Sequence, residues 1–166
     1  MSQSGRSVIG RAACLAAIAF ICGCGADSGT GVDAPELLIL YSIDGRDLEP
    51  GEEAKTEEKF HEFPVLGKLE IRDREKFAEI MGALKDGMAR SDGTTAKCFW
   101  PRHGIRFSEN GNYVDYVICF ECLQLQIHQN GQSKTDPIVR DPQAVLNRYL
   151  TSAGIKLAPG VDDEDE

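Results

Sequence analysis

Hydrophobic and polar residues follow distinct spacings along the chain, and each spacing predicts an element. Residues 36–43 contain a short apolar run that the turn signal Asp44-Gly45 closes, so a strand is predicted there. A second strand is predicted over 65–71. Apolar residues then recur at three- and four-residue steps from 74 to 89, after Asp73, which is a favourable N-cap. This spacing predicts an amphipathic helix.

Alternation of apolar and polar residues is clearest over 105–118, on both sides of Asn110-Gly111. This dipeptide favours a two-residue type I′ hairpin turn, and such a turn fixes the register of the two strands. In that register Arg106 lies opposite Asp115, so the pairing is matched in charge as well as in polarity. The other predicted pairs are Phe107 with Val114, Ile105 with Tyr116 and Gly104 with Val117.

The last third of the chain adds more strands and one helix. Alternation from 123 to 127 leads to a second turn at Asn130-Gly131, after which a strand is predicted near 137–140. Asp141-Pro142 predicts the start of a second helix, and Gly154 predicts its end. The element order predicts an α+β fold, with an antiparallel sheet of four to five strands and two amphipathic helices packed on it.

The N-terminal residues have the pattern of a removable export signal. Arg6 and Arg11 supply positive charge, and the apolar stretch of about ten residues that follows is too short to cross a bilayer as a helix. It ends in Ile21-Cys22-Gly23-Cys24, which resembles the lipobox of bacterial lipoproteins. The resemblance implies cleavage before Cys24, a diacylglyceryl group on its thiol and an acyl chain on its amine. The alternatives are an ordinary secreted protein cleaved nearby and a short signal anchor.

Lipid on Cys24 predicts where the protein resides. Two or three acyl chains hold a protein at a membrane, because each buried methylene contributes ~0.8 kcal/mol. Gly25 rather than Asp follows the cysteine, and the lipobox resemblance then implies the periplasmic leaflet of the outer membrane. Cys22 is not the expected lipidation site, because the bulky Ile21 would occupy the place of a small residue. The predicted organisation is a signal peptide over 1–23, a lipidated flexible tether over 24–35, a single domain over 36–159 and an acidic tail over 160–166.

Charge excludes one class of partner. Removing the signal takes two of the 18 basic residues and none of the 27 acidic ones, so the net charge changes from −9 to −11. A body this acidic is repelled by phosphate backbones. Nucleic acid is therefore not an expected partner, whereas the membrane is, through the lipid.

Of the six cysteines, three remain in the predicted domain, namely Cys98, Cys119 and Cys122. In an oxidising compartment an odd number leaves one thiol unpaired, unless all three serve one site. The segments Cys98-Phe99-Trp100-Pro101-Arg102-His103-Gly104 and Ile118-Cys119-Phe120-Glu121-Cys122 resemble a motif pair of an uncharacterised family of bacterial exported proteins and lipoproteins. The resemblance covers residues 63–159 and implies no particular activity.

Three interpretations of these cysteines are open. In the structural interpretation, extending the hairpin register backwards with a one-residue bulge brings Cys98 opposite Cys122 and allows a disulfide, or else all three cysteines are plain buried thiols. Three thiolates with His103 would suit tetrahedral zinc, although Cys119 and Cys122 point to opposite faces of a regular strand. A redox thiol is the third interpretation, because Arg102 falls opposite Cys119 and favours the thiolate.

One basic cluster stands out against the acidic background, formed by Arg102, His103 and Arg106. It either binds an anionic group, such as a carboxylate or a phosphate, or pairs internally with acidic residues. The sequence contains no Ser/His/Asp signature, phosphate-binding glycine loop or paired-carboxylate motif. We therefore expect a lipid-anchored envelope protein that acts as a binding or envelope-associated module rather than an enzyme, without a cofactor. The alternatives are a zinc-binding domain and a thiol-based redox protein.

Overall fold

The computed structural model describes residues 37–46, 56–109 and 111–159, which all belong to one unit of the chain. The predicted signal peptide, Cys24, the tether and the acidic tail lie outside the described residues, as does Asn110. Within the described ranges, no helix has both the length and the apolar character needed to span a bilayer.

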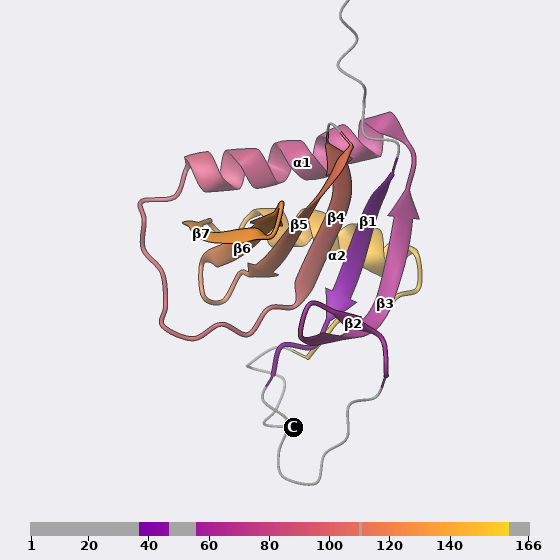
Figure 1. The fold of residues 1–166 in the computed structure, drawn as a ribbon, viewed down its shortest axis with the longest axis horizontal. Helices are drawn as coiled ribbons and strands as arrows, with labels where there is room; N and C mark the ends of the chain where they lie inside the picture. Colours follow the sequence, from indigo (N-terminus) through magenta and orange to yellow (C-terminus); the bar gives the residue numbers. More distant parts are fainter. Residues whose placement is uncertain (1–36, 47–55, 110, 160–166) are drawn as a thin grey trace, which may run out of the picture. The chain divides into compact units, whose positions relative to one another are not determined.

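The main element is a single antiparallel sheet that curls into a half-barrel (Figure 1). Its seven strands are β1 (Leu38–Ile43), β2 (Lys59–Phe60), β3 (Phe63–Ile71), β4 (His103–Glu109), β5 (Asn112–Cys119), β6 (Gln124–Gln129) and β7 (Gln132–Pro137). The strand order across the sheet is β2-β3-β1-β4-β5-β6-β7. The N-terminal strand β1 is therefore central, and it joins the β2–β3 half of the sheet to the β4–β7 half.

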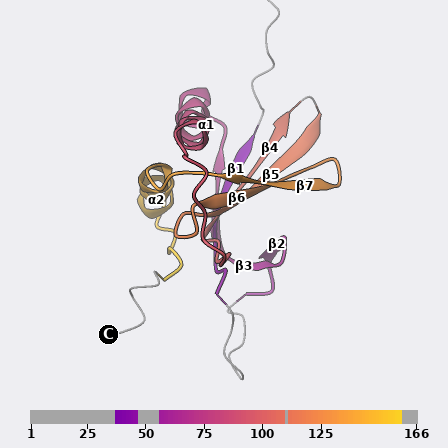
Figure 2. The ribbon, with the colours of Figure 1, turned by 90° about the vertical axis from the view of Figure 1, so that its left-hand side faces the viewer.

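Two helices, α1 (Arg74–Ala89) and α2 (Pro142–Ser152), lie on the same side of the sheet (Figure 2). Apolar side chains from the inner faces of both helices and from one face of the sheet fill the space between them. The fully buried residues of this core include Leu38, Leu40, Ile80, Leu84, Ile105, Ile118, Leu125, Leu146 and Leu150.

The helix ends follow the sequence signals to different degrees. The predicted first helix is confirmed at both ends, and the Asp73 carboxylate accepts from the backbone N–H groups of Glu75 and Lys76 at 2.9 and 3.0 Å. The second helix also begins at Pro142 as predicted. Asp141 is the N-cap residue, but its carboxylate makes no capping hydrogen bond and instead accepts from Arg90 Nη1 at 2.7 Å.

The opposite face of the sheet is covered in part by the short β2 strand (Figure 2). The Phe60 ring stacks on Tyr41 with the ring centroids 4.3 Å apart, above the buried Val117. Gly104 makes room for this ring, because a Cβ atom at position 104 would lie only 2.6 Å from Phe60 Cδ1.

The register predicted for the hairpin between β4 and β5 is confirmed. Arg106 lies opposite Asp115, and the other three predicted pairs are present as well. Gly111 has a φ of +78°, the left-handed conformation that a tight hairpin turn requires. Asn110, the first residue of the predicted type I′ turn, lies outside the described residues.

The predicted fold class, with a sheet of four to five strands, is wrong. The sheet has seven strands, and the described part of the chain is mostly sheet with two helices. The apolar pattern predicts no strand at 59–60, and it places the last strand at 137–140 instead of 132–137. Both elements are too short or too polar to give a hydrophobic signal, because β2 has two residues and β7 reads Gln-Ser-Lys-Thr-Asp-Pro. Main-chain pairing with β3 and β6 holds them at the two edges.

Candidate functional site

The sulfur atoms of three cysteines meet where β5 ends. Cys119 is the last residue of β5, and a turn from Phe120 to Cys122 follows it. Leu123 closes this turn with a φ of +54°. The turn brings Cys119 and Cys122 together as a disulfide, with their Cα atoms 5.2 Å apart. The two side chains therefore do not point to opposite faces, as they would on a regular strand.

Cys98 approaches this disulfide from the segment that precedes β4. Its Sγ lies 3.1 Å from Cys122 Sγ, and its thiol is free. Cys98 is exposed, whereas Cys119 and Cys122 are both completely buried. An exposed cysteine thus contacts a buried disulfide. The sequence predicted that Cys98 and Cys122 come close, but the structure places the bond between Cys119 and Cys122.

Hydrogen bonds hold the Cys98 segment against the turn. The Ala96 N–H donates to the Cys122 carbonyl oxygen at 2.9 Å. The side-chain Nε2 of Gln124 donates to the carbonyl oxygens of Ala96 and Cys98 at 3.2 and 2.7 Å. These three hydrogen bonds hold the backbone of residues 96 and 98 against the turn, and so keep the Cys98 sulfur next to Cys122. No sequence pattern singles out Gln124, because its role depends on a loop without regular spacing.

The cysteines lie on the face of the sheet that the helices leave open. Residues two apart on a strand share a face, so Cys119 is on the same side as Val117 and the Phe60 cluster. Here Cys98 lines an open hollow of about 940 Å³. Its aromatic lining is Phe63, Phe99 and Trp100, and its charged lining is Asp44, Arg46, Lys59 and Glu62. Trp100 is the single tryptophan of the chain and is 40% exposed.

The structure separates the three residues of the predicted basic cluster. His103 is buried on the side of the sheet that faces α2, whereas Arg106 is on the opposite side. Each has an internal partner: Glu121 for Arg102 at 2.6 Å, Asn147 for His103 at 2.7 Å, and Asp115 for Arg106 at 2.7 and 2.6 Å. The geometry therefore favours internal pairing over a shared anion. The Glu121 carboxylate offsets the charge of Arg102, which weakens any effect of this guanidinium on Cys119.

His103, the fourth residue of the predicted zinc set, packs against Phe120 and not beside the sulfurs. The two ring centroids are 5.4 Å apart, and His103 Nε2 lies 2.7 Å from Asn147 Oδ1. Burial lowers the pKa of His103 from 6.5 to about 4, so the ring is neutral at pH 7. Among the described residues, no group of three or more His, Cys, Asp or Glu side chains is arranged to hold a metal ion.

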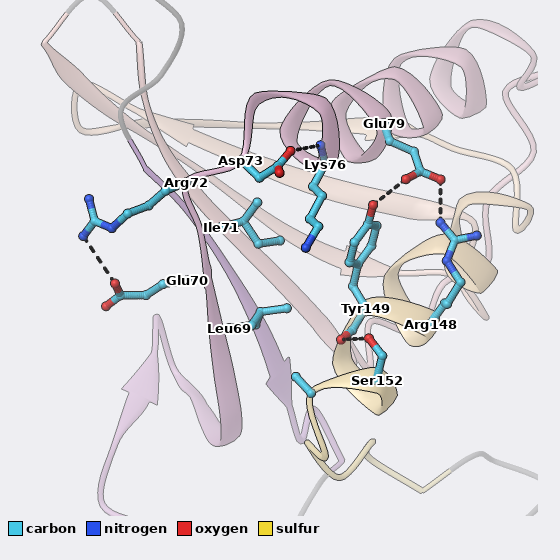
Figure 3. Close-up of a pocket in the computed structure, with 11 residues that line it drawn as sticks. Leu69, Glu70, Ile71, Arg72, Asp73, Lys76, Glu79, Arg148, Tyr149 and Ser152 are labelled. Carbon is cyan, nitrogen blue, oxygen red and sulfur yellow. Dashed lines mark hydrogen bonds and ion pairs between the residues drawn. The ribbon is translucent and has the colours of Figure 1, made fainter.

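A second hollow, of about 720 Å³, lies between β3 and the two helices (Figure 3). Figure 3 shows Lys76 reaching into it from α1, between Ile71 and Tyr149. The other central groups bond to one another, since Glu79 accepts from the Tyr149 hydroxyl and from Arg148. These hydrogen bonds lower the pKa of Glu79. The network ties α1 to α2, which is a structural role.

A third hollow, of about 330 Å³, holds a histidine pair that the sequence did not bring to notice. His61 Nε2 lies 3.0 Å from Asp115 Oδ2, and the rings of His61 and His128 have centroids 4.0 Å apart. Burial and the neighbouring His61 lower the pKa of His128. Asp115 is already bound by Arg106, so this cluster fastens the turn after β2 to the sheet.

No family model, curated protein or solved structure matches the chain. The choice of a functional site among these features therefore rests on their chemistry. Among the described residues, the cysteine cluster brings together an exposed cysteine, a disulfide in contact with it and an adjoining hollow.

Proposed function

We propose that the chain is a lipid-anchored protein of the bacterial cell envelope whose domain exchanges thiols and disulfides. The reacting groups are Cys98, Cys119 and Cys122. The observation that carries the proposal is the 3.1 Å contact between the Cys98 Sγ and the Cys122 Sγ of the disulfide. The export signal expected from the sequence supports it, because disulfides form and persist outside the cytosol.

The first step is an exchange within the chain. The Cys98 thiolate attacks Cys122 Sγ, the Cys98–Cys122 bond forms, and the Cys119–Cys122 bond breaks. Cys119 leaves as a thiolate and takes up a proton, so no electrons are gained or lost. The Cys122 N–H donates to Cys119 Sγ at 3.2 Å, which stabilises the departing thiolate.

The second step involves a partner dithiol. Exchange within the chain places one disulfide sulfur on the exposed Cys98, where a partner thiolate attacks it and Cys122 leaves. The second partner thiolate then breaks the mixed disulfide and releases Cys98. The partner loses two electrons and two protons, and the chain finishes with three thiols. Run in reverse, the same steps reduce a partner disulfide.

Reduction of the full chain by dithiothreitol, followed by acid quenching and mass mapping of alkylated cysteines, tests the proposal. In Cys98→Ser the remaining disulfide is buried, so we expect reduction at least ~10-fold slower than in the wild type. The matched control is Cys119→Ala, whose single disulfide includes the exposed Cys98 and is reduced at least as fast as in the wild type.

Other results would contradict the proposal and identify its competitors. Equal rates for Cys98→Ser and the wild type would remove Cys98 from the reaction. A disulfide that survives reductant in the folded wild type would support a binding module with a structural bond. Three thiols with stoichiometric zinc would support a zinc-binding domain.

A further inference from the structure

We infer that the partner of the exchange site is a polypeptide, held by an apolar side chain next to its own cysteine pair. This inference rests on the proposed function and names the substrate class of the same site. It starts from the fact that Cys98, Phe99 and Trp100 all line one hollow. A partner sulfur that reaches Cys98 through this hollow passes beside these aromatic rings.

The aromatic wall of the hollow is next to the reactive thiol in the sequence. Phe99 and Trp100 directly follow Cys98, whose carbonyl oxygen accepts from the Gln124 side chain. The Phe99 ring packs edge-to-face on Phe63 with the centroids 6.2 Å apart. Trp100 keeps 40% of its surface exposed. A preorganised aromatic surface with an exposed tryptophan is typical of sites that bind another protein.

The open shape of the hollow suits a segment of polypeptide. Its volume of about 940 Å³ lies within the range of roughly 300–1,000 Å³ for ligand sites, so the volume alone does not select the partner. The hollow is open to solvent, so an extended segment enters and leaves it without being enclosed. A small disulfide would touch Cys98 but leave most of the aromatic wall uncovered.

Charge favours the same partner. The hollow carries both signs, with Asp44 and Glu62 against Arg46 and Lys59, and Asp44 and Arg46 form an ion pair at 2.8 Å. The chain as a whole has a net charge of −9. A small anionic thiol of the glutathione type is repelled by that charge and finds no excess of positive charge in the hollow. A polypeptide of low net charge suits both conditions.

Rates of disulfide reduction by the fully reduced full chain test the inference. The probes are a peptide disulfide with leucine and phenylalanine next to its cysteines, and oxidised glutathione. We expect the wild type to reduce the peptide at least ~10-fold faster than oxidised glutathione. Trp100→Ala should lower the peptide rate ~10-fold and the glutathione rate by much less, and Trp100→Phe should recover part of the loss in the peptide rate.

Tyr113→Ala is the matched control, because Tyr113 is 69% exposed but lines a different hollow. We expect its rates to equal those of the wild type. Equal wild-type rates for the two probes, or a peptide rate unchanged in Trp100→Ala, would overturn the inference and leave the exchange activity intact. Failure of the wild type to reduce either probe would overturn the proposed function itself.

Discussion

The His103 ring illustrates how the surroundings of a residue decide its chemistry. It is 2% exposed, and its Nδ1 has no hydrogen-bond partner in the part of the chain that the structure describes. Burial lowers its pKa to about 4. A histidine that charges only below pH 4 is neither a base nor a cation near neutral pH. Its role is to fill space and to bond Asn147 of α2.

Acid should destabilise the fold through this residue. Unfolded His103 takes up a proton near pH 6.5, and the folded residue does so near 4. Its stabilising effect is therefore fully present above pH 6.5 and is lost as the pH falls toward 4. We expect the free energy of unfolding to fall by about 2 kcal/mol more between pH 7 and pH 4.5 in the wild type than in His103→Gln.

Urea denaturation of both proteins at the two pH values measures this difference. Glutamine can still bond Asn147 but does not titrate, and the acidic groups contribute equally to the two proteins. The comparison therefore isolates the effect of imidazole protonation on the free energy of unfolding. An equal loss of stability in both proteins would mean that His103 is protonated in the folded state at pH 4.5.

Among contacts between single residues, the sequence predicted those that depend on strand register. The Arg106–Asp115 pair followed from a two-residue turn and is present. The disulfide partner of Cys122 did not follow, because it depends on a turn ending in Leu123 with a positive φ. Leucine is not a residue that signals this conformation. The His61–His128 contact was likewise not predictable from the sequence, since it joins a short turn to a strand far away in the chain.

Among the elements, the packing of β2 on the sheet has a clear test in Gly104. An added Cβ would lie 2.6 and 2.7 Å from two ring atoms of Phe60, and stacking on Tyr41 prevents the ring from moving freely. We expect Gly104→Ala to lower the free energy of unfolding by about 1–3 kcal/mol. Urea denaturation followed by the fluorescence of Trp100 measures the change.

Gly82→Ala is the matched control for this overpacking. Gly82 lies inside α1, and an added Cβ there meets nothing within 4 Å. Since alanine is a better helix former than glycine, we expect this variant to be more stable by about 0.5–1 kcal/mol. A Gly104→Ala protein as stable as the wild type would show that Phe60 does not rest on the sheet in solution.

The elements themselves were predictable where one face is buried and a local signal marks the ends. The helix α1 has both an apolar stripe and the Asp73 cap, and its predicted bounds are confirmed. The strands β2 and β7 have neither, because their stability comes from backbone pairing at the edges of the sheet. A pattern of side chains carries little information about such strands.

On the scale of the whole molecule, the two faces of the sheet differ in what covers them. One face buries the core under α1 and α2, which gives the domain its stability. The other face is covered only in part, and it carries Cys98 and the aromatic hollow. An exchange site is useful only where disulfides are made and broken, so the proposed function depends on the compartment to which the chain is sent.

Lipidation at Cys24 is the prediction that tests this compartment, and Cys22 provides the control. Cys24→Ser removes the thiol that would carry the diacylglyceryl group, so the chain should leave the membrane fraction and lack acyl mass. Cys22→Ser keeps that thiol and also keeps a small residue before Gly23, so it should remain membrane-bound like the wild type. Fractionation and intact mass spectrometry of the cell-derived proteins distinguish the two variants. A wild-type polypeptide that still begins at Met1 without acyl groups would contradict the anchor, and the exchange chemistry would then need another route to an oxidising compartment.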